Sequence, residues 1–511
     1  MSFLSQAKTK RLLSVHGWSG TVLGLLLYIC LFTGAIVVFE DEIDIWAQGA
    51  ITHRDDLGIR IDNDFRKAAR TVNPSYYDEV LIFRQSDGQM QYRFQSLQPE
   101  PRQITRIVLD PATNKITDRW QGASTEQPPT PGAALRNFWV DLHVQLYLPN
   151  PYGLILVGVL GLMMMAAAIS GILIHSHVVR DAFVAARNPA RLVGARDLHV
   201  LAGTWGLPFA FILAFTGAFF GFVGNFGVPV MATAAFGGDQ QRMIETLLGT
   251  PDKIDPTVAP MASLDYVLAD ARKRSGGTLS SIQIQNYNSV SSRIAVRAAA
   301  APGQLSGSTL EFDGVTRAYL GESHLVGQVP SVGNSLLGLM GPLHFGNFAG
   351  VASKLVWTGM GLAMAFVTAS GLLLWTKRRQ DNPTWQRFRR WIMGVIWGLP
   401  FAMLVSALAF FLTLPAGDPD WWTPAGFLLG ALTALRMGVP RLRLATCALC
   451  LALPLVRHLT GGASWSEALI AGAWPVLLID LLFLIAGLVL LRQHKLHSQQ
   501  NLRTMIQEPA E

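Results

Sequence analysis

The chain has 511 residues, half of them hydrophobic and only 15% charged, with a formal net charge of +7. Its mean hydropathy is positive, and apolar runs of about 20 residues recur, the length that crosses roughly 30 Å of hydrocarbon. These properties exclude a soluble globular protein and indicate an integral membrane protein of the α-helical class.

The apolar runs predict eight transmembrane helices. The first could be confused with a secretory signal peptide, but VVFEDEIDIW follows it without a small-residue cleavage site, so we expect a retained anchor. The sixth and seventh are short and are separated only by residues 436–443. The predicted spans are 18–39, 152–175, 200–224, 352–375, 391–414, 422–436, 444–459 and 468–491.

Lysine and arginine are concentrated before the first predicted span, in every second loop between spans, and after the last span. Cytoplasmic loops retain such residues, so their positions predict a multi-pass membrane protein with both termini in the cytoplasm. In a Gram-negative bacterium this would be the inner (cytoplasmic) membrane. The positive net charge is then an orientation signal, and no nucleic-acid partner is expected. The basic groups lie at 8–11, 180–196, 377–390, 436–443 and 492–495.

Two long segments between spans then lie outside the cytoplasm, and each reads as a small α+β domain. In the first, 64–72 has helical periodicity, and strands follow that are separated by turn signals at 87–88 and 110–111. In the second, 264–274 predicts the helix, and the strands end in a hairpin around 313–314. The predicted organisation is a cytoplasmic N-terminus and first span (1–40), a periplasmic α+β domain (41–142), two spans with a cytoplasmic loop (143–224), a second periplasmic α+β domain (225–343), a fourth span (344–380) and a C-terminal four-span region (381–511).

The first 380 residues also indicate an internal duplication. Residues 16–34 align with 199–217, which places His16 over His199 and Thr33-Gly34 over Thr216-Gly217. A second pair of segments begins at His143 and His344 and ends in SGILIH (170–175) and SGLLLW (370–375). Four histidines therefore lie at equivalent membrane margins.

Paired imidazoles inside a helical bundle are the ligands that a haem iron takes. We pair His143 with His344 at the outer margin, and Arg136, seven residues before His143, could meet a haem propionate. At the inner margin we pair His16 with His199, with Arg196 nearby. Small residues that let the flat ring approach are expected at Gly17, Gly20 and Gly203.

His175 is an alternative inner ligand, because it ends the second span where the other half has Trp375. It could replace His16 or His199. His143 and His175 are separated by roughly 48 Å if the intervening chain is helical, so they cannot serve one iron. Two separate haem sites follow if both are ligands.

The combined pattern resembles a known family. The chain resembles the PepSY-associated transmembrane proteins in four features: a histidine-headed span ending in Thr-Gly, α+β extracytoplasmic domains, DLH at 197–199 and PLHFG at 342–346. That family includes iron-regulated inner-membrane proteins and di-haem siderophore reductases. The resemblance covers roughly residues 10–380. It implies two b-type haems and the reduction of a ferric siderophore or another iron chelate, with haem-dependent ferric-chelate reductase as the enzyme activity.

The chain contains no nucleotide-binding glycine fingerprint, P-loop or HExxH motif. A reductase would therefore take electrons from membrane quinol or from a separate cytoplasmic reductase. Reducing Fe(III) to Fe(II) weakens binding by hard oxygen donors and releases the metal.

Two other functions fit the same sequence. One is a non-redox carrier of siderophore, haem or a metal ion, with a pathway that includes Asp480, which must be paired within a span. The other is a membrane-anchored scaffold that regulates an envelope protein and needs no cofactor. A reductase works in detergent, whereas a carrier needs a sealed compartment.

Overall fold

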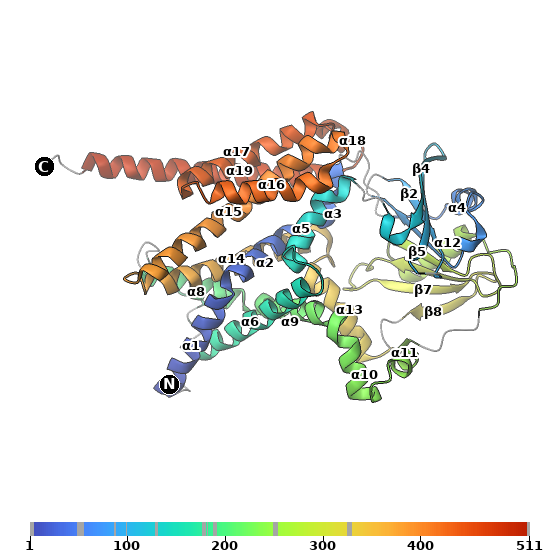
Figure 1. Ribbon diagram of the computed structural model, residues 1–511, viewed down its shortest axis with the longest axis horizontal. Helices are drawn as coiled ribbons and strands as arrows, with labels where there is room; N and C mark the ends of the chain where they lie inside the picture. Colours follow the sequence, from blue (N-terminus) through green and yellow to red (C-terminus); the bar gives the residue numbers. More distant parts are fainter. Residues whose placement is uncertain are drawn as a thin grey trace.

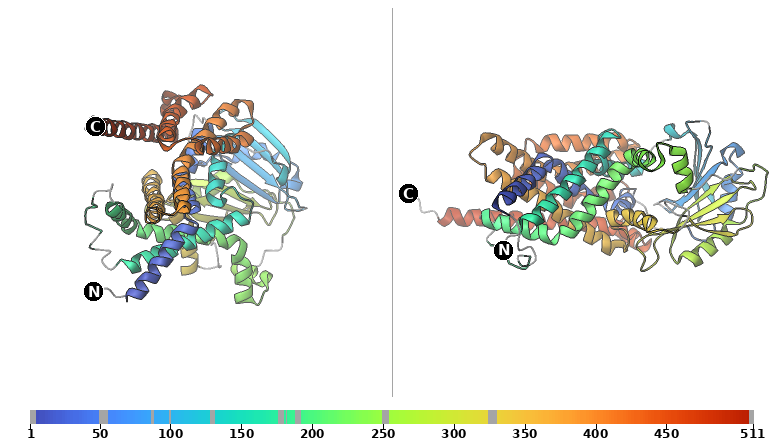
Figure 2. Two further views of the ribbon diagram at one scale, coloured as in Figure 1. Left: turned by 60° about the vertical axis from the view of Figure 1, so that its left-hand side comes forward. Right: turned by 90° about the horizontal axis from the view of Figure 1, so that it is seen from below.

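The computed structural model consists of a helical bundle with a β-sheet at one end (Figures 1 and 2). The chain starts and ends on the side of the bundle away from the sheet, as Figure 1 shows. The residues that the structure describes are 5–48, 56–85, 88–98, 100–127, 131–175, 180, 182–187, 192–248, 254–323 and 330–507.

The bundle falls into a first part, up to α14, and a C-terminal part. The helices of the first part are α1 (Gln6–Val22), α2 (Gly24–Val37), α3 (Glu40–Gln48), α5 (Ala134–Gln145), α6 (Tyr152–Ile174), α8 (Leu192–Trp205), α9 (Leu207–Phe222), α10 (Val228–Phe236), α11 (Gln240–Leu248), α13 (Val332–Phe345) and α14 (Gly350–Lys377). Those of the C-terminal part are α15 (Pro383–Thr413), α16 (Pro419–Ala434), α17 (Val439–Leu459), α18 (Trp465–Ile470) and α19 (Trp474–Gln507).

Six helical segments among the described residues are long and apolar enough to cross a membrane. A seventh span is possible if α1 and α2, which meet at an angle of 65°, act together. The predicted sixth span corresponds to α16, whose 16 residues extend about 24 Å, less than the roughly 30 Å of a bilayer core. The structure therefore supports a multi-pass membrane protein with six or seven spans and does not confirm the predicted eight.

The third predicted span, 200–224, differs from the structure at both ends. The continuous apolar segment runs over Leu207–Phe236, because α9 passes through a π-helical turn (Val223–Gly227) into α10. His199 lies before it, on the separate helix α8. Pro208 sits in the first turn of α9, where a missing backbone N–H is tolerated, and so separates the two helices.

The two predicted α+β segments form one antiparallel sheet of eight strands. Within the sheet the strands follow the order β4-β3-β2-β1-β5-β6-β7-β8. The first segment supplies β1 (Glu79–Arg84), β2 (Met90–Gln95), β3 (Gln103–Asp110) and β4 (Lys115–Ala123), and the second supplies β5 (Leu279–Gln285), β6 (Arg293–Ala298), β7 (Ser308–Asp313) and β8 (Tyr319–Ser323).

The two four-stranded halves join where β1 pairs with β5, with Ile82 opposite Ile282. Alternate residues of both strands are buried in one hydrophobic core that also contains Phe65 of α4 (Asp62–Ala69) and Leu268 of α12 (Leu264–Ser275). Figure 1 shows both helices on the face of the sheet turned away from the bundle. The opposite, polar face is turned toward the bundle.

Two short helices lead from the sheet back into the bundle, and each ends shortly after a histidine. α5 ends two residues after His143, and α13 ends one residue after His344. Gly346 caps α13 with φ of +66°, and a methyl group there would lie 2.4 Å from Cγ of Trp357, so only glycine fits. Both histidines consequently lie in the last turn of their helices, at the end of the bundle nearest the sheet.

Candidate functional site: two histidine pairs

The first histidine pair consists of His143 and His344, which we name the sheet-side pair. Their ring centres are 6.2 Å apart, and the ring planes are inclined by 27°. Each ring comes from a different half of the chain. The structure thus brings together the two residues that the alignment of the halves predicted to be partners.

The second pair consists of His16 on α1 and His199 on α8, which we name the distal pair. Their ring centres are 6.3 Å apart, nearly the same separation as in the sheet-side pair, but the planes are inclined by 73°. The two pairs lie toward opposite ends of the bundle, because α1 begins on the side away from the sheet (Figure 1).

The distal histidines are oriented by equivalent contacts on two different helices. Nδ1 of His16 lies 2.9 Å from the Ala167 carbonyl and 3.3 Å from the Ser170 hydroxyl. Nδ1 of His199 lies 3.1 Å from the Val367 carbonyl and 3.0 Å from the hydroxyl of the aligned serine, Ser370. A carbonyl oxygen only accepts, so Nδ1 carries the hydrogen and Nε2 keeps a free lone pair.

The sheet-side histidines are oriented in the same way through different groups. Nδ1 of His143 donates to the carbonyl of Cys30 at 2.9 Å. Nδ1 of His344 lies 2.8 Å from the hydroxyl of Thr216, which itself donates to the Ile212 carbonyl and so accepts from the ring. All four imidazoles therefore present Nε2 as the nitrogen available to a metal.

Four glycines lie directly against the four rings, and none of them was among the glycines predicted for this role. They belong to the repeated Thr-Gly and Ser-Gly pairs, a signal that was present in the sequence. Of the predicted glycines, Gly17 is covered by Trp375. A methyl group added to Gly20 or Gly203 would have no histidine ring within 4 Å. At the sheet-side pair, a methyl group added to Gly34 would lie 2.7 Å from Cε1 of His143, and one added to Gly217 would lie 3.4 Å from Cε1 of His344. At the distal pair, a methyl group added to Gly171 would lie 3.3 Å from Cε1 of His16, and one added to Gly371 would lie 3.2 Å from Cε1 of His199.

The two predicted arginines differ in their surroundings. Arg136 lies on α5, seven residues before His143, and its guanidinium is 3.8 Å from the carboxylate of Glu40 on α3. Burial raises the pKa of Glu40, and the neighbouring Asp41 adds to this, although the Arg136 cation opposes it. Arg196 is exposed on α8, one turn before His199.

The aspartate of the DLH motif binds an arginine. Arg187 donates to both oxygens of Asp197, at 2.7 and 2.8 Å. This bidentate bond lowers the pKa of Asp197 to about 2, so the carboxylate stays ionised at neutral pH. The motif thus ties the loop before α8 to the helix that carries His199.

His175 is the residue that caps the C-terminal end of α6, one turn after Gly171. The structure pairs His16, and not His175, with His199. Trp375, at the position that aligns with His175, packs against Gly17 beside His16 and lies edge-on to Trp18 at 5.5 Å. The tryptophan therefore takes part in the packing around the distal pair.

Charged residues are also buried near the sheet-side pair. Lys354, at the start of α14, is 6% exposed and donates to both oxygens of Glu42 on α3, at 2.7 and 3.0 Å. No group of three or more His, Cys, Asp or Glu side chains suited to a metal ion occurs within the described part of the chain. Each histidine pair consists of two imidazoles only.

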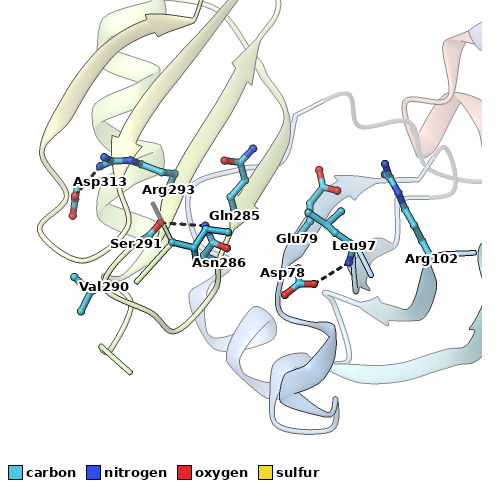
Figure 3. A pocket seen from close by; sticks show the side chains of 11 residues that line it. Asp78, Glu79, Leu97, Arg102, Gln285, Asn286, Val290, Ser291, Arg293 and Asp313 are labelled. Atoms are coloured by element: carbon cyan, nitrogen blue, oxygen red, sulfur yellow. Dashed lines mark hydrogen bonds and ion pairs between the residues drawn. The ribbon is translucent and has the colours of Figure 1, made fainter. Parts of the chain in front are cut away.

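A cavity of about 730 Å³ opens where the two halves of the sheet meet. Glu79, Gln285, Arg293 and Asp313 are neighbours across four strands on the polar face, and the other lining residues belong to the adjoining loops. Figure 3 shows Glu79, Gln285 and Arg102 pointing in the same direction. The carboxylate of Glu79 accepts from Gln95 and Gln283, one residue from each half. Arg293 pairs with Asp313 at 3.0 Å. The cavity offers both signs of charge and suits a polar, water-soluble ligand.

Comparisons with known proteins identify the first part of the chain. The model of the PepSY-associated TM region matches residues 13–378, which include all four paired histidines. An uncharacterized protein, PA4219, of Pseudomonas aeruginosa is 29% identical over 383 residues, covering 69% of this chain and 92% of the relative. The match ends before α15, so the C-terminal helices lie outside the family region. The chain belongs to the PepSY-associated transmembrane family.

Proposed function

We propose that the protein is a di-haem reductase of the bacterial inner membrane, which moves electrons across the membrane to a ferric chelate, such as a ferric siderophore, on the sheet side. The observation that carries this proposal is the geometry of the two histidine pairs. Each pair would hold one b-type haem.

The ring separations fit one iron between two imidazoles. A metal–imidazole bond is about 2 Å long and the nitrogen lies about 1.1 Å from the ring centre, so two axial imidazoles have centres about 6 Å apart. The measured separations are 6.2 and 6.3 Å. The porphyrin supplies the four remaining nitrogens, which is why two protein ligands suffice at each site.

The hydrogen bonds support the same assignment. Metal-bound histidines as a rule donate their second ring N–H to a carbonyl or another oxygen, which fixes the tautomer and raises ligand basicity. All four Nδ1 atoms have such an acceptor.

Bound haem would supply reversible one-electron chemistry. The protein would set the position of the two irons, one toward each end of the bundle, and would tune them through the acceptors of Nδ1. Arg136, on the helix of His143, and Arg196, on the helix of His199, would be suited to propionate groups. Membrane quinol or a separate cytoplasmic reductase would reduce the distal site, with both termini in the cytoplasm.

The polar cavity of the sheet supports a docking place for the chelate. Part of its lining lies on the face of the sheet that is turned toward the bundle (Figure 1). One electron passed to the chelate converts Fe(III) to Fe(II), whose weaker attraction for hard oxygen donors frees the metal.

Asp480 argues against the carrier alternative. Its carboxylate accepts from the indoles of Trp46 and Trp465 and from Arg457, so both oxygens are engaged. Charged groups inside a membrane bundle are tolerated when they are paired and hydrogen-bonded in this way. The buried cluster has the composition of a structural contact.

The test is the optical spectrum of the full-length protein purified in detergent, with a haem assay per chain. We expect two haems in the parent protein. The double variant His143→Ala with His344→Ala should lose one haem, and the double variant His16→Ala with His199→Ala should lose the other. His458→Ala, an exposed histidine on α17, is the matched control and should keep both. A protein without haem from haem-supplied cells, or a spectrum indifferent to all four substitutions, refutes the proposal.

A further inference from the structure

The two helices that carry the sheet-side histidines are held very differently. In α5, Ala134, Leu135, Phe138, Trp139 and Leu142 are buried. In α13, which carries His344, none of the 14 residues is buried. α5 is packed by α2, α3 and α6 of the first part of the bundle and also by α15 and α16 of the C-terminal part.

The contact closest to His143 is a buried hydrogen bond between the two parts of the bundle. The Trp139 indole donates to the hydroxyl of Ser406 on α15 at 3.0 Å, and the two residues are 2% and 0% exposed. Trp139 precedes His143 by four residues, which places both on one face of α5. Phe138 adds an edge-on contact with Phe427 of α16 at 5.4 Å.

A second contact holds the helix that supplies the acceptor of His143. The Tyr28 hydroxyl on α2 donates to the Ile396 carbonyl of α15 at 3.1 Å. Tyr28 lies two residues before Cys30, whose carbonyl accepts from Nδ1 of His143. α15 therefore contacts both the ligand helix and the acceptor helix.

A third contact fixes α3, which packs on α5. Trp46 of α3 is fully buried and donates to Asp480 of α19 at 2.7 Å. Arg457 of α17 donates to the same carboxylate at 3.1 Å. In an apolar environment such bonds are directional and costly to leave unmade, so they fix the relative placement of the helices.

We propose that α15–α19 act as a brace that sets the orientation of His143 and thereby tunes the sheet-side haem alone. Trp139, Ser406 and Tyr28 are positioning residues in this proposal. It rests on the proposed function, and it gives a role to the region that the family match leaves out. The contacts of His344 and its helix described above, from Thr216 and Trp357, come instead from the first part of the bundle, so the brace acts on the sheet-side site through His143.

The test uses full-length Ser406→Ala and Tyr28→Phe, which remove one hydroxyl each and leave the histidines untouched. The readouts are a redox titration that resolves the two haems, their electron paramagnetic resonance signals, and the rate of haem transfer to an excess of a haem-scavenging apoprotein. We expect an altered sheet-side signal and about tenfold faster haem loss from that site, with the distal haem unchanged. Ser406→Thr should restore the parent behaviour.

Thr433→Ala is the control, because this half-buried side chain of α16 donates its hydroxyl hydrogen bond within its own helix, to the Leu429 carbonyl. If the parent protein holds two haems and both variants leave the sheet-side signal and haem loss unchanged, the brace is refuted while the proposed function stands. Equal changes at both haems would also refute it, because they would indicate a general loss of stability. A parent protein without haem refutes the proposed function itself.

Discussion

The hydroxyl of Ser370 lies 3.0 Å from Nδ1 of His199, and the aligned Ser170 has the same relation to His16 at 3.3 Å. Both serines also donate to carbonyls of their own helices, so their oxygens accept from the imidazoles. Each distal ring is thus held by a carbonyl and a hydroxyl together.

Removing both hydroxyls should raise the midpoint potential of the distal haem. A hydrogen bond from Nδ1–H makes the imidazole a stronger donor and favours Fe(III), so its loss favours Fe(II). One bond of about 1 kcal/mol corresponds to about 40 mV for a one-electron couple. The measurement is a redox titration of the double variant Ser170→Ala with Ser370→Ala beside the parent protein. An unchanged midpoint potential of the distal haem would contradict the assigned contacts.

The glycines beside the sheet-side rings should differ in their tolerance of a methyl group. In Gly34→Ala the methyl would lie 2.7 Å from the His143 ring, closer than carbon atoms can approach, whereas in Gly217→Ala the distance to His344 is 3.4 Å. We expect Gly34→Ala to lose the sheet-side haem and Gly217→Ala to keep it. Haem content per chain decides between them, and equal retention would show that the ring is free to move.

The two haems should be distinguishable by electron paramagnetic resonance. The sheet-side rings are inclined by 27° and the distal rings by 73°. In low-spin ferric haem, nearly parallel imidazole planes give a rhombic signal, and nearly perpendicular planes give a strongly anisotropic one. We expect one signal of each type, with the rhombic one absent from His143→Ala. Two rhombic signals would contradict the distal geometry.

Asp480→Ala should strongly destabilise the C-terminal part. Arg457 is 1% exposed, and the substitution would leave its charge buried with the Ala463 carbonyl but without the opposite charge of Asp480. Breaking a buried pair in this way costs about 3–5 kcal/mol. Thermal unfolding in detergent measures the effect. Replacing Arg457 and Asp480 together by leucine should recover much of the loss, and a double variant as unstable as Asp480→Ala would contradict the explanation.

The periodic patterns of the sequence predicted most secondary structure near the sheet. The predicted helices at 64–72 and 264–274 correspond to α4 and α12, and the predicted strands correspond to the eight strands of the sheet. Hydrophobic alternation and turn residues act locally, so they are readable from sequence. The pairing of β1 with β5, which merges two predicted domains into one sheet, depends on contacts between residues about 200 positions apart and has no local signal.

The sequence by itself determined the membrane class, the family resemblance and the four aligned histidines with their predicted pairing, in which His175 remained an alternative to His16 or His199. Only the tertiary structure decided that the distal pair is His16 with His199, which glycines lie against the rings, and that α15–α19 hold the helix of His143. The physical reason is that residue type and spacing fix which groups are available, whereas the packing of distant helices fixes which groups meet and at what angle.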